Sequence, residues 1–169
     1  MIKMKIQSVL VSGGSLTSLV ILTTAEPYKG GSVVQLPIRI GAAEAHAISL
    51  SGEGIALSRP ITVDLLSNVI ERLDAAVVAT TIVSVEDKTF YARLDLKRAD
   101  GAVVSLDARP SDAIALALHA HAPIFAEESV LDAAAMPDFK QVEDSAKHEK
   151  IEEFHDFVES LSPDDFAQT

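Results

Sequence analysis

The segment from Ala113 to Leu118 constrains the fold more than any other, because alanine, isoleucine and leucine occupy all of its positions. A helix that is apolar on every side must be enclosed on every side, and its alanines allow a sheet to approach closely. Pro110 is favoured in the first turn of a helix, and Ser111 is a suitable N-cap. Asp112 near the N-terminus stabilises a helix by about 0.3–1 kcal/mol. We therefore expect a buried helix capped by Ser111.

Alternating apolar and polar residues, rich in β-branched side chains, predict six strands ahead of this helix. The strands are expected at residues 3–11, 17–24, 33–40, 76–85, 89–97 and 102–106. Turn residues separate them at Gly13–Gly14, Gly30–Gly31, Asp87–Lys88 and Asp100–Gly101. Short turns of this kind join antiparallel neighbours, so we expect one mixed or antiparallel sheet packed by helices.

Two further helices are predicted between the third and the fourth strand. The first, in GAAEAHAISL from Gly41, rests on its alanine content and stops at Ser51–Gly52. The second begins at Thr62, a good N-cap residue. Its apolar face is expected to comprise Leu66, Val69, Ile70 and Leu73.

The two halves of the chain resemble each other weakly at an offset of 68 residues. LPIRIGAAEAHAISL then lies over VSLDARPSDAIALAL, so that Glu44 corresponds to Asp112. Each half has three strands and a helix, followed by a short extended piece and another helix. We therefore predict an α+β fold of two similar β-β-β-α units. An internal duplication places Glu44 and Asp112 at equivalent helix starts, facing one cleft.

The net charge of −11 is concentrated near one end of the chain. Residues 127–169 contain thirteen of the 25 acidic residues and only three of the 14 lysines and arginines. We expect an α/β domain over residues 1–136, and a linker with an acidic amphipathic helix over residues 137–169. The apolar stripe of that helix is expected to pack on the domain or on a neighbouring subunit, and it consists of Ile151, Phe154, Val158 and Leu161.

The composition excludes several classes of function. Because there is no cysteine, disulfides, zinc–thiolate sites and cysteine nucleophiles are excluded, and a reducing cytoplasm is the expected location. No stretch approaches the roughly 20 apolar residues of a membrane span, so no membrane partner is expected. Glycine-rich phosphate loops and serine-nucleophile elbows are absent from the sequence.

The histidines are expected to be structural or exposed. His119 and His121 are two residues apart, and on a helix such side chains diverge by about 200°. His148 and His155 share a helical face, but a zinc site needs more ligands than the sequence offers around them.

The charges in front of the buried helix have two interpretations. In the structural one, Ser111 and Asp112 stabilise the helix start, and Asp107 forms an ion pair with Arg109. In the functional one, Asp107 and Asp112 hold Mg²⁺ or Mn²⁺, because hard cations take oxygen ligands and bridge to phosphate. Arg109 can then clamp that phosphate with two hydrogen bonds.

The same residues carry a resemblance to a known family. LDARPSDAIALAL, together with LPIRIGAAEAHAISL, RPITVDLLSNVIERLDA, VSVEDKTFYARLDL and APIFAEESVL, resembles the bifunctional nuclease domain family of bacteria and plants. The resemblance implies a compact and often oligomeric α/β domain, and in some members cleavage of both DNA and RNA. One departure is Val63, where many members have histidine. The matching motif residues are Glu44, Arg59, Asp64, Asp107, Arg109, Ser111 and Asp112.

Two hypotheses of function follow. The first is a nuclease that hydrolyses DNA and RNA with little sequence preference, assisted by Mg²⁺ or Mn²⁺. Its catalytic candidates are Asp107, Asp112, Glu44 and Asp64, and its substrate-binding candidates are Arg109, Arg59 and Ser111. The second is a non-catalytic oligomeric module for binding or regulation, in which these charged motifs are structural. In both, the protein is expected to form a homo-oligomer.

Overall fold

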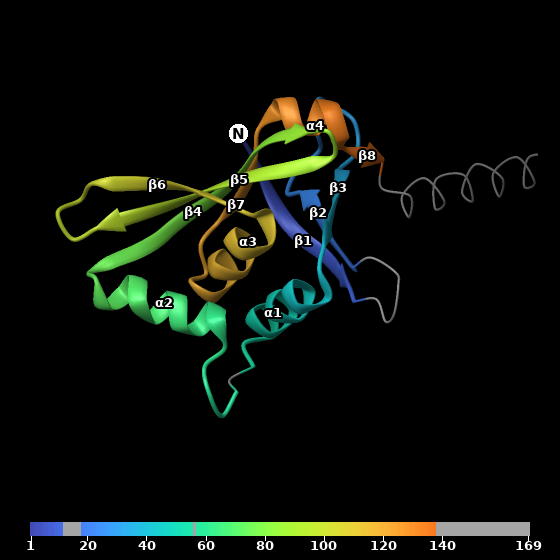
Figure 1. The fold of residues 1–169 in the computed structure, drawn as a ribbon. Helices are drawn as coiled ribbons and strands as arrows, with labels where there is room; N and C mark the ends of the chain where they lie inside the picture. The colour runs from blue at the N-terminus through green and yellow to red at the C-terminus, as the bar shows by residue number, and fades with distance from the viewer. Residues whose placement is uncertain (12–17, 56, 138–169) are drawn as a thin grey trace, which may run out of the picture. The chain divides into compact units, whose positions relative to one another are not determined.

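A computed structural model describes residues 1–11, 18–55 and 57–137. They form an α+β domain with one mixed sheet and helices, as predicted (Figure 1). The strands are β1 (Ile2–Leu10), β2 (Ser18–Thr24), β3 (Val34–Ile40), β4 (Ala75–Glu86), β5 (Thr89–Arg98), β6 (Val103–Ala108), β7 (Ile124–Ala126) and β8 (Met136–Pro137). The helices are α1 (Ala42–Glu53), α2 (Thr62–Arg72), α3 (Pro110–His119) and α4 (Glu128–Ala134).

The sheet consists of two antiparallel three-stranded groups joined through β7, with the short β8 beside β3 at one edge. Its strand order is β6-β5-β4-β7-β1-β2-β3-β8, and β7 runs antiparallel to β1 and parallel to β4. A helix follows each group, α1 after β3 and α3 after β6, so the β-β-β-α order occurs twice. The two helices begin at Ala42 and Pro110, which correspond at the offset of 68 residues. A duplication as the origin of this order stays a prediction.

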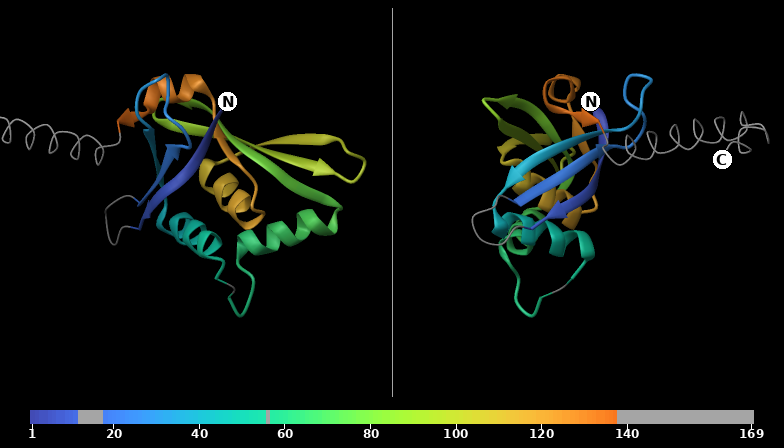
Figure 2. Two further views of the ribbon diagram at one scale, coloured as in Figure 1. Left: turned by 180° about the vertical axis from the view of Figure 1, so that it is seen from behind. Right: turned by 90° about the vertical axis from the view of Figure 1, so that its right-hand side faces the viewer.

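Helix α3 is the centre of the domain, as its composition predicts. It packs against α1, α2, β4 and β5, and it lies between the strands and the other two helices in Figures 1 and 2. Seven of its residues are buried: Pro110, Ser111, Ala113, Ile114, Ala115, Leu116 and Ala117. The apolar segment is therefore enclosed on all sides.

The predicted cap of α3 was wrong by two residues. Arg109 is the N-cap and Pro110 is the first helical residue, so Ser111 already lies inside the helix and is only 6% exposed. Proline keeps the preceding residue out of the helical region, and Arg109 accordingly has extended backbone with φ −66° and ψ 142°. The helix start lacks a side-chain cap hydrogen bond.

Helix α2 differs from its prediction in two ways. Its N-cap is Ile61 and not Thr62, because the Asp64 carboxylate accepts the Ile61 backbone N–H at 2.9 Å and thereby satisfies the helix start. Of the predicted apolar face, only Ile70 is buried. The large side chains that stay exposed are Leu65, Leu66, Val69 and Leu73, at 57%, 43%, 43% and 74%.

The loop between β2 and β3 is bound to α4 by a polar cluster. The Tyr28 hydroxyl donates to Asp132 Oδ1 at 2.9 Å, and Lys29 Nζ forms an ion pair with the same oxygen. None of the described helices is long and apolar enough to cross a bilayer. The predicted Gly13–Gly14 turn and the predicted acidic C-terminal helix lie outside the described residues.

Candidate functional site

The starts of α1 and α3 are joined by one arginine. Arg109 Nε and Nη2 donate to the two oxygens of Asp112 at 2.8 and 3.1 Å, and Nη1 donates to Glu44 Oε1 at 3.0 Å. Glu44 and Asp112 are each the third residue of their helix. The predicted equivalence of these two positions is therefore seen in space, and both carboxylates bind the same guanidinium.

The electrostatics of this contact keep Arg109 charged. Its pKa is raised, first by the hydrogen bonds to Asp112 and the charge of that carboxylate, and to a smaller degree by Glu44. The Arg109 side chain is 66% exposed, whereas that of Glu44 is 25% exposed. The guanidinium is thus both fixed in position and reachable from solvent.

Gly41 makes room for Glu44. The Glu44 carboxylate folds back over the N-cap of α1 and lies in contact distance of the place where a side chain of residue 41 would begin. Any larger residue at this position would displace the carboxylate from Arg109. The glycine before the alanine-rich helix is therefore part of the site.

A hollow of about 380 Å³ opens beside Arg109, and we call it the Arg109 hollow. The end of β3, the β4–β5 turn and the starts of α1 and α3 surround it. Backbone N–H groups at helix starts favour anions, and three cationic side chains line the same space. Its lining residues are Ile38, Arg39, Ile40, Gly41, Glu44, Lys88, Thr89, Phe90, Arg109, Pro110 and Ser111.

The turn that carries Lys88 has an unusual backbone. Asp87 and Lys88 have φ values of 46° and 69°, the left-handed region that two-residue hairpin turns require and that glycine adopts most easily. A non-glycine residue there costs about 1–2 kcal/mol. Such strain is commonly kept at functional positions, and here it holds a lysine at the rim of the hollow.

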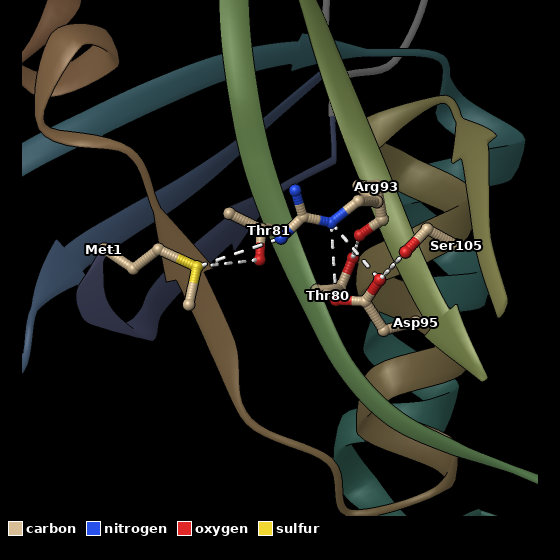
Figure 3. Close-up of polar contacts among 6 residues, drawn as sticks. All are labelled: Met1, Thr80, Thr81, Arg93, Asp95 and Ser105. Carbon is tan, nitrogen blue, oxygen red and sulfur yellow. Dashed lines mark hydrogen bonds and ion pairs between the residues drawn. The ribbon is translucent and has the colours of Figure 1, made fainter. Parts of the chain in front are cut away.

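Asp107 does not join this site. Its neighbour Ala108 packs into the core, and adjacent side chains on a strand point to opposite faces, so Asp107 points away from α3. It lies opposite Arg93 of β5 in the sheet register. Figure 3 shows the polar contacts on this outer face, where Arg93 Nε and the Ser105 hydroxyl donate to Asp95 Oδ1 at 3.2 and 2.6 Å.

The residues present do not fit a metal ion held jointly by Asp107 and Asp112. Both Asp112 oxygens accept hydrogen bonds from Arg109. The Asp107 side chain projects from the opposite face of the sheet. Within residues 1–11, 18–55 and 57–137, no three His, Asp or Glu side chains are grouped to hold a metal. A requirement for Mg²⁺ or Mn²⁺ stays a prediction.

Asp64 lies in a second hollow, of about 430 Å³, at the other end of α3. Its Oδ1 is 3.3 Å from His119 Nε2, and we call this space the His119 hollow. His121 lines it as well, because α3 ends at His119 and His121 takes left-handed backbone with φ 53°. The two histidines were expected to diverge as on a helix, but α3 ends at His119, so that expectation does not apply to His121.

The two remaining motif positions have ordinary surroundings. Val63, at the position where many family members have histidine, packs against both apolar clusters of the core. The histidine beside Asp64 in this chain is His119 of α3. Arg59 is exposed in the loop between α1 and α2 and is not among the residues that line either hollow. The structure thus brings together Glu44, Arg109, Ser111 and Asp112, and separates them from Asp64, Asp107 and Arg59.

Comparison with known proteins identifies the family. Residues 21–138 match the bifunctional nuclease domain, and the chain belongs to that family. It is 39% identical over 138 residues to the uncharacterized protein MT1877 of Mycobacterium tuberculosis strain CDC 1551 / Oshkosh, covering 79% of this chain and 82% of that protein. The uncharacterized protein Rv1829 of strain ATCC 25618 / H37Rv matches with the same values. Every residue that lines either hollow lies in the family match.

Proposed function

We propose that the protein is a nuclease that hydrolyses DNA and RNA with little sequence preference, and that the Arg109 hollow binds the phosphate. The observation that carries the proposal is the position of Arg109 between the starts of α1 and α3, at the rim of a hollow that Arg39 and Lys88 also line. The family supports the activity. We also propose a cytoplasmic location and a homo-oligomeric state, neither of which the nuclease activity requires.

The hollow has the charge that a phosphodiester needs. Three cationic side chains line the hollow, Glu44 is the one lining carboxylate among the described residues, and the N–H groups of two helix starts add partial positive charge. A guanidinium binds phosphate through two parallel hydrogen bonds. Asp112 holds Nε and Nη2, so an incoming phosphate competes with Glu44 for the Nη1 side of Arg109.

Displacement from Arg109 gives Glu44 a chemical role. Freed from Nη1, its carboxylate lies beside the bound phosphate and can accept a proton from a water molecule. The water oxygen then attacks phosphorus while the P–O bond to one sugar breaks, and the departing sugar oxygen takes a proton from solvent. The folded-back position over Gly41 keeps the carboxylate close in the resting state. Glu44 is therefore the residue that we expect to act as the base, and Asp112 the residue that orients Arg109.

Degradation of single-stranded DNA and RNA by the purified chain tests the proposal, with Mg²⁺, with Mn²⁺ and with EDTA. Glu44→Gln keeps the size of the side chain and removes its basicity, so cleavage is expected to fall about 100-fold. Glu26→Gln, at an exposed position of the β2–β3 loop, is the matched control and is expected to cleave normally. Equal activity in all three proteins would place the chemistry elsewhere.

A second candidate function is a non-catalytic oligomeric module for binding or regulation. The contacts that favour it are those by which Arg109 ties α1 to α3, together with the exposed leucines of α2. In this case no purified preparation cleaves nucleic acid under any of the three ionic conditions. The Glu44→Gln substitution is then expected to lower thermal stability only, since there is no cleavage for it to reduce.

A further inference from the structure

Two elements on the same side of the sheet, α2 and β6, expose an unusual number of large apolar side chains. Val104 and Leu106 of β6 lie opposite Leu96 and Leu94 of β5, on the sheet face against which Ile70 of α2 packs. Single exposed apolar residues are ordinary, but a group of them marks a contact surface. We call this group the α2–β6 surface: Leu65, Leu66, Val69 and Leu73 of α2, and Val104 and Leu106 of β6, each 39–74% exposed.

Among the strands of the described residues, β6 is also an open edge of the sheet. It is the terminal strand, and its register with β5 runs from Val103 to Ala108 without a bulge. Edge strands are normally protected by proline, lysine or a bulge, and β6 has only Asp107 as a charged residue. Its outer row of backbone N–H and C=O groups is therefore available to another strand.

We propose that β6 pairs antiparallel with β6 of a second copy of this chain, and that α2 completes the contact. The hydrogen bonding of β6 to β5 fixes which of its residues face the second copy. Arg98 N–H donates to the Ala102 carbonyl at 2.9 Å, so alternation turns the backbone groups of Ala102, Val104 and Leu106 toward β5. Those of Val103, Ser105 and Asp107 point to the open side, where Ser105 meets Ser105 of the second copy.

The side chains are self-complementary in this register. Leu106 lies opposite Val104 of the second copy on the α2 side, so apolar residues meet apolar ones. On the other face, Asp107 lies opposite Val103 of the second copy, whose own neighbour on β5 is Lys97. Each Asp107 thus has Arg93 directly beside it on β5, and Lys97 of the second copy one strand beyond Val103 on the same face. This charge complementarity favours a second copy over an unrelated strand.

The contact has the symmetry of a two-fold dimer, because the same surface serves on both sides. About six backbone hydrogen bonds form along β6, and the exposed side chains of α2 are covered by the second copy. The Arg109 hollow is lined by residues of other elements. The dimer is therefore independent of the proposed nuclease function, and either can fail alone.

Cysteine cross-linking of the full chain tests the register, since the natural sequence has no cysteine. Ser105→Cys places two thiols across the two-fold axis, with Cα atoms about 5.5 Å apart, so mild oxidation is expected to give a covalent dimer. Val103→Cys alone is the matched control and is expected to remain uncrosslinked. A mixture of Val103→Cys with Asp107→Cys is expected to cross-link. Cross-linking of Val103→Cys to itself in place of this pattern overturns the register.

Sedimentation velocity tests the association itself. The wild-type chain of 18.0 kDa is expected to sediment as a dimer or a higher assembly of dimers, and Val104→Lys, with unchanged circular dichroism, as its dissociated form. The expected rise of the dissociation constant is at least 100-fold, because each copy brings a lysine into the apolar contact. A monomeric wild-type chain at its highest soluble concentration overturns the proposal, as does a Val104→Lys protein that stays dimeric.

Discussion

The two ends of α3 present opposite chemistry on one ten-residue helix. At its start, the guanidinium of Arg109 is bound by two carboxylates beside further cationic side chains. At its end, His119 and His121 line a hollow in which Asp64 is the only carboxylate among the described residues. The partial positive charge of a helix start attracts anions, whereas its end favours cations or a protonated imidazole. A helix that is wholly buried in its middle can thus carry two separate polar sites at its ends.

Removal of the arginine is the strongest way to test this comparison. Arg109→Gln leaves Glu44 and Asp112 without their shared cation, and we expect nucleic-acid cleavage to fall about 100-fold. The unfolding free energy should fall by no more than about 1 kcal/mol, because the contact is largely exposed. Cleavage assays and thermal unfolding measure the two effects. Arg59→Gln is the control, and an equal loss there would contradict the separation of the two arginines.

The other end of the helix is tested through Asp64. Asp64→Ala removes the acceptor of the Ile61 N–H and the partner of His119, so the unfolding free energy is expected to fall by about 0.5–2 kcal/mol. Cleavage by the remaining folded protein is expected to be normal. Denaturant unfolding and cleavage at a temperature well below the melting point give the two values. If His119→Gln abolishes cleavage in a stable protein, the reactive end of α3 is the histidine end.

The substitution Lys88→Gly is expected to change stability and nucleic-acid binding in opposite directions. Lys88→Gly relieves the left-handed backbone strain, so we expect the unfolding free energy to rise by about 0.5–1 kcal/mol. The same change removes one cation from the Arg109 hollow, so nucleic-acid affinity should fall. The slope of the logarithm of the binding constant against the logarithm of the salt concentration should decrease in magnitude by about one. Fluorescence anisotropy at several salt concentrations measures this slope. An unchanged slope would exclude Lys88 from phosphate binding.

The smallest expected effect lies at an ion cluster outside both hollows. The hydrogen bond from Lys29, followed by that from Tyr28, lowers the pKa of Asp132. A carboxyl group whose pKa is lower in the folded state stabilises the fold above its unfolded pKa, and this contribution disappears as the pH falls through the folded value. We therefore expect Asp132→Asn to lower the melting temperature slightly at neutral pH and to have no effect at low pH, where the carboxyl is protonated. A deficit that grows as the pH falls would contradict this.

Much of the fold could be predicted from local pattern. The six predicted strands agree with β1 to β6 to within a few residues, and the apolar run of α3 predicted its burial. Alternation and helical periodicity follow from backbone geometry, so they are visible in the sequence. The caps of α2 and α3 were misplaced because Asp64 and Pro110 act on the residues before them, which residue preferences alone do not reveal.

The site could be predicted only in part. Only four residues lie between Asp107 and Asp112, yet Asp107 follows the alternation of a strand and Asp112 lies in the first turn of a helix, so their side chains point in different directions. Glu44 is 65 residues from Arg109, and only the packing of α1 beside α3 brings them to 3.0 Å. His119 and His121 share a hollow because the helix ends between them, and helix ends are the least predictable boundaries.

The sequence by itself determined which segments become strands and helices, that α3 is buried, and that the chain resembles the bifunctional nuclease domain family. Each of these follows from neighbouring residues, whose spacing meets the periodicity of one element. Only the tertiary structure decided that one arginine serves two helix starts, that Asp64 belongs to another hollow, and that the apolar side of α2 is left exposed. These outcomes depend on contacts between elements far apart in the chain, which no local spacing specifies.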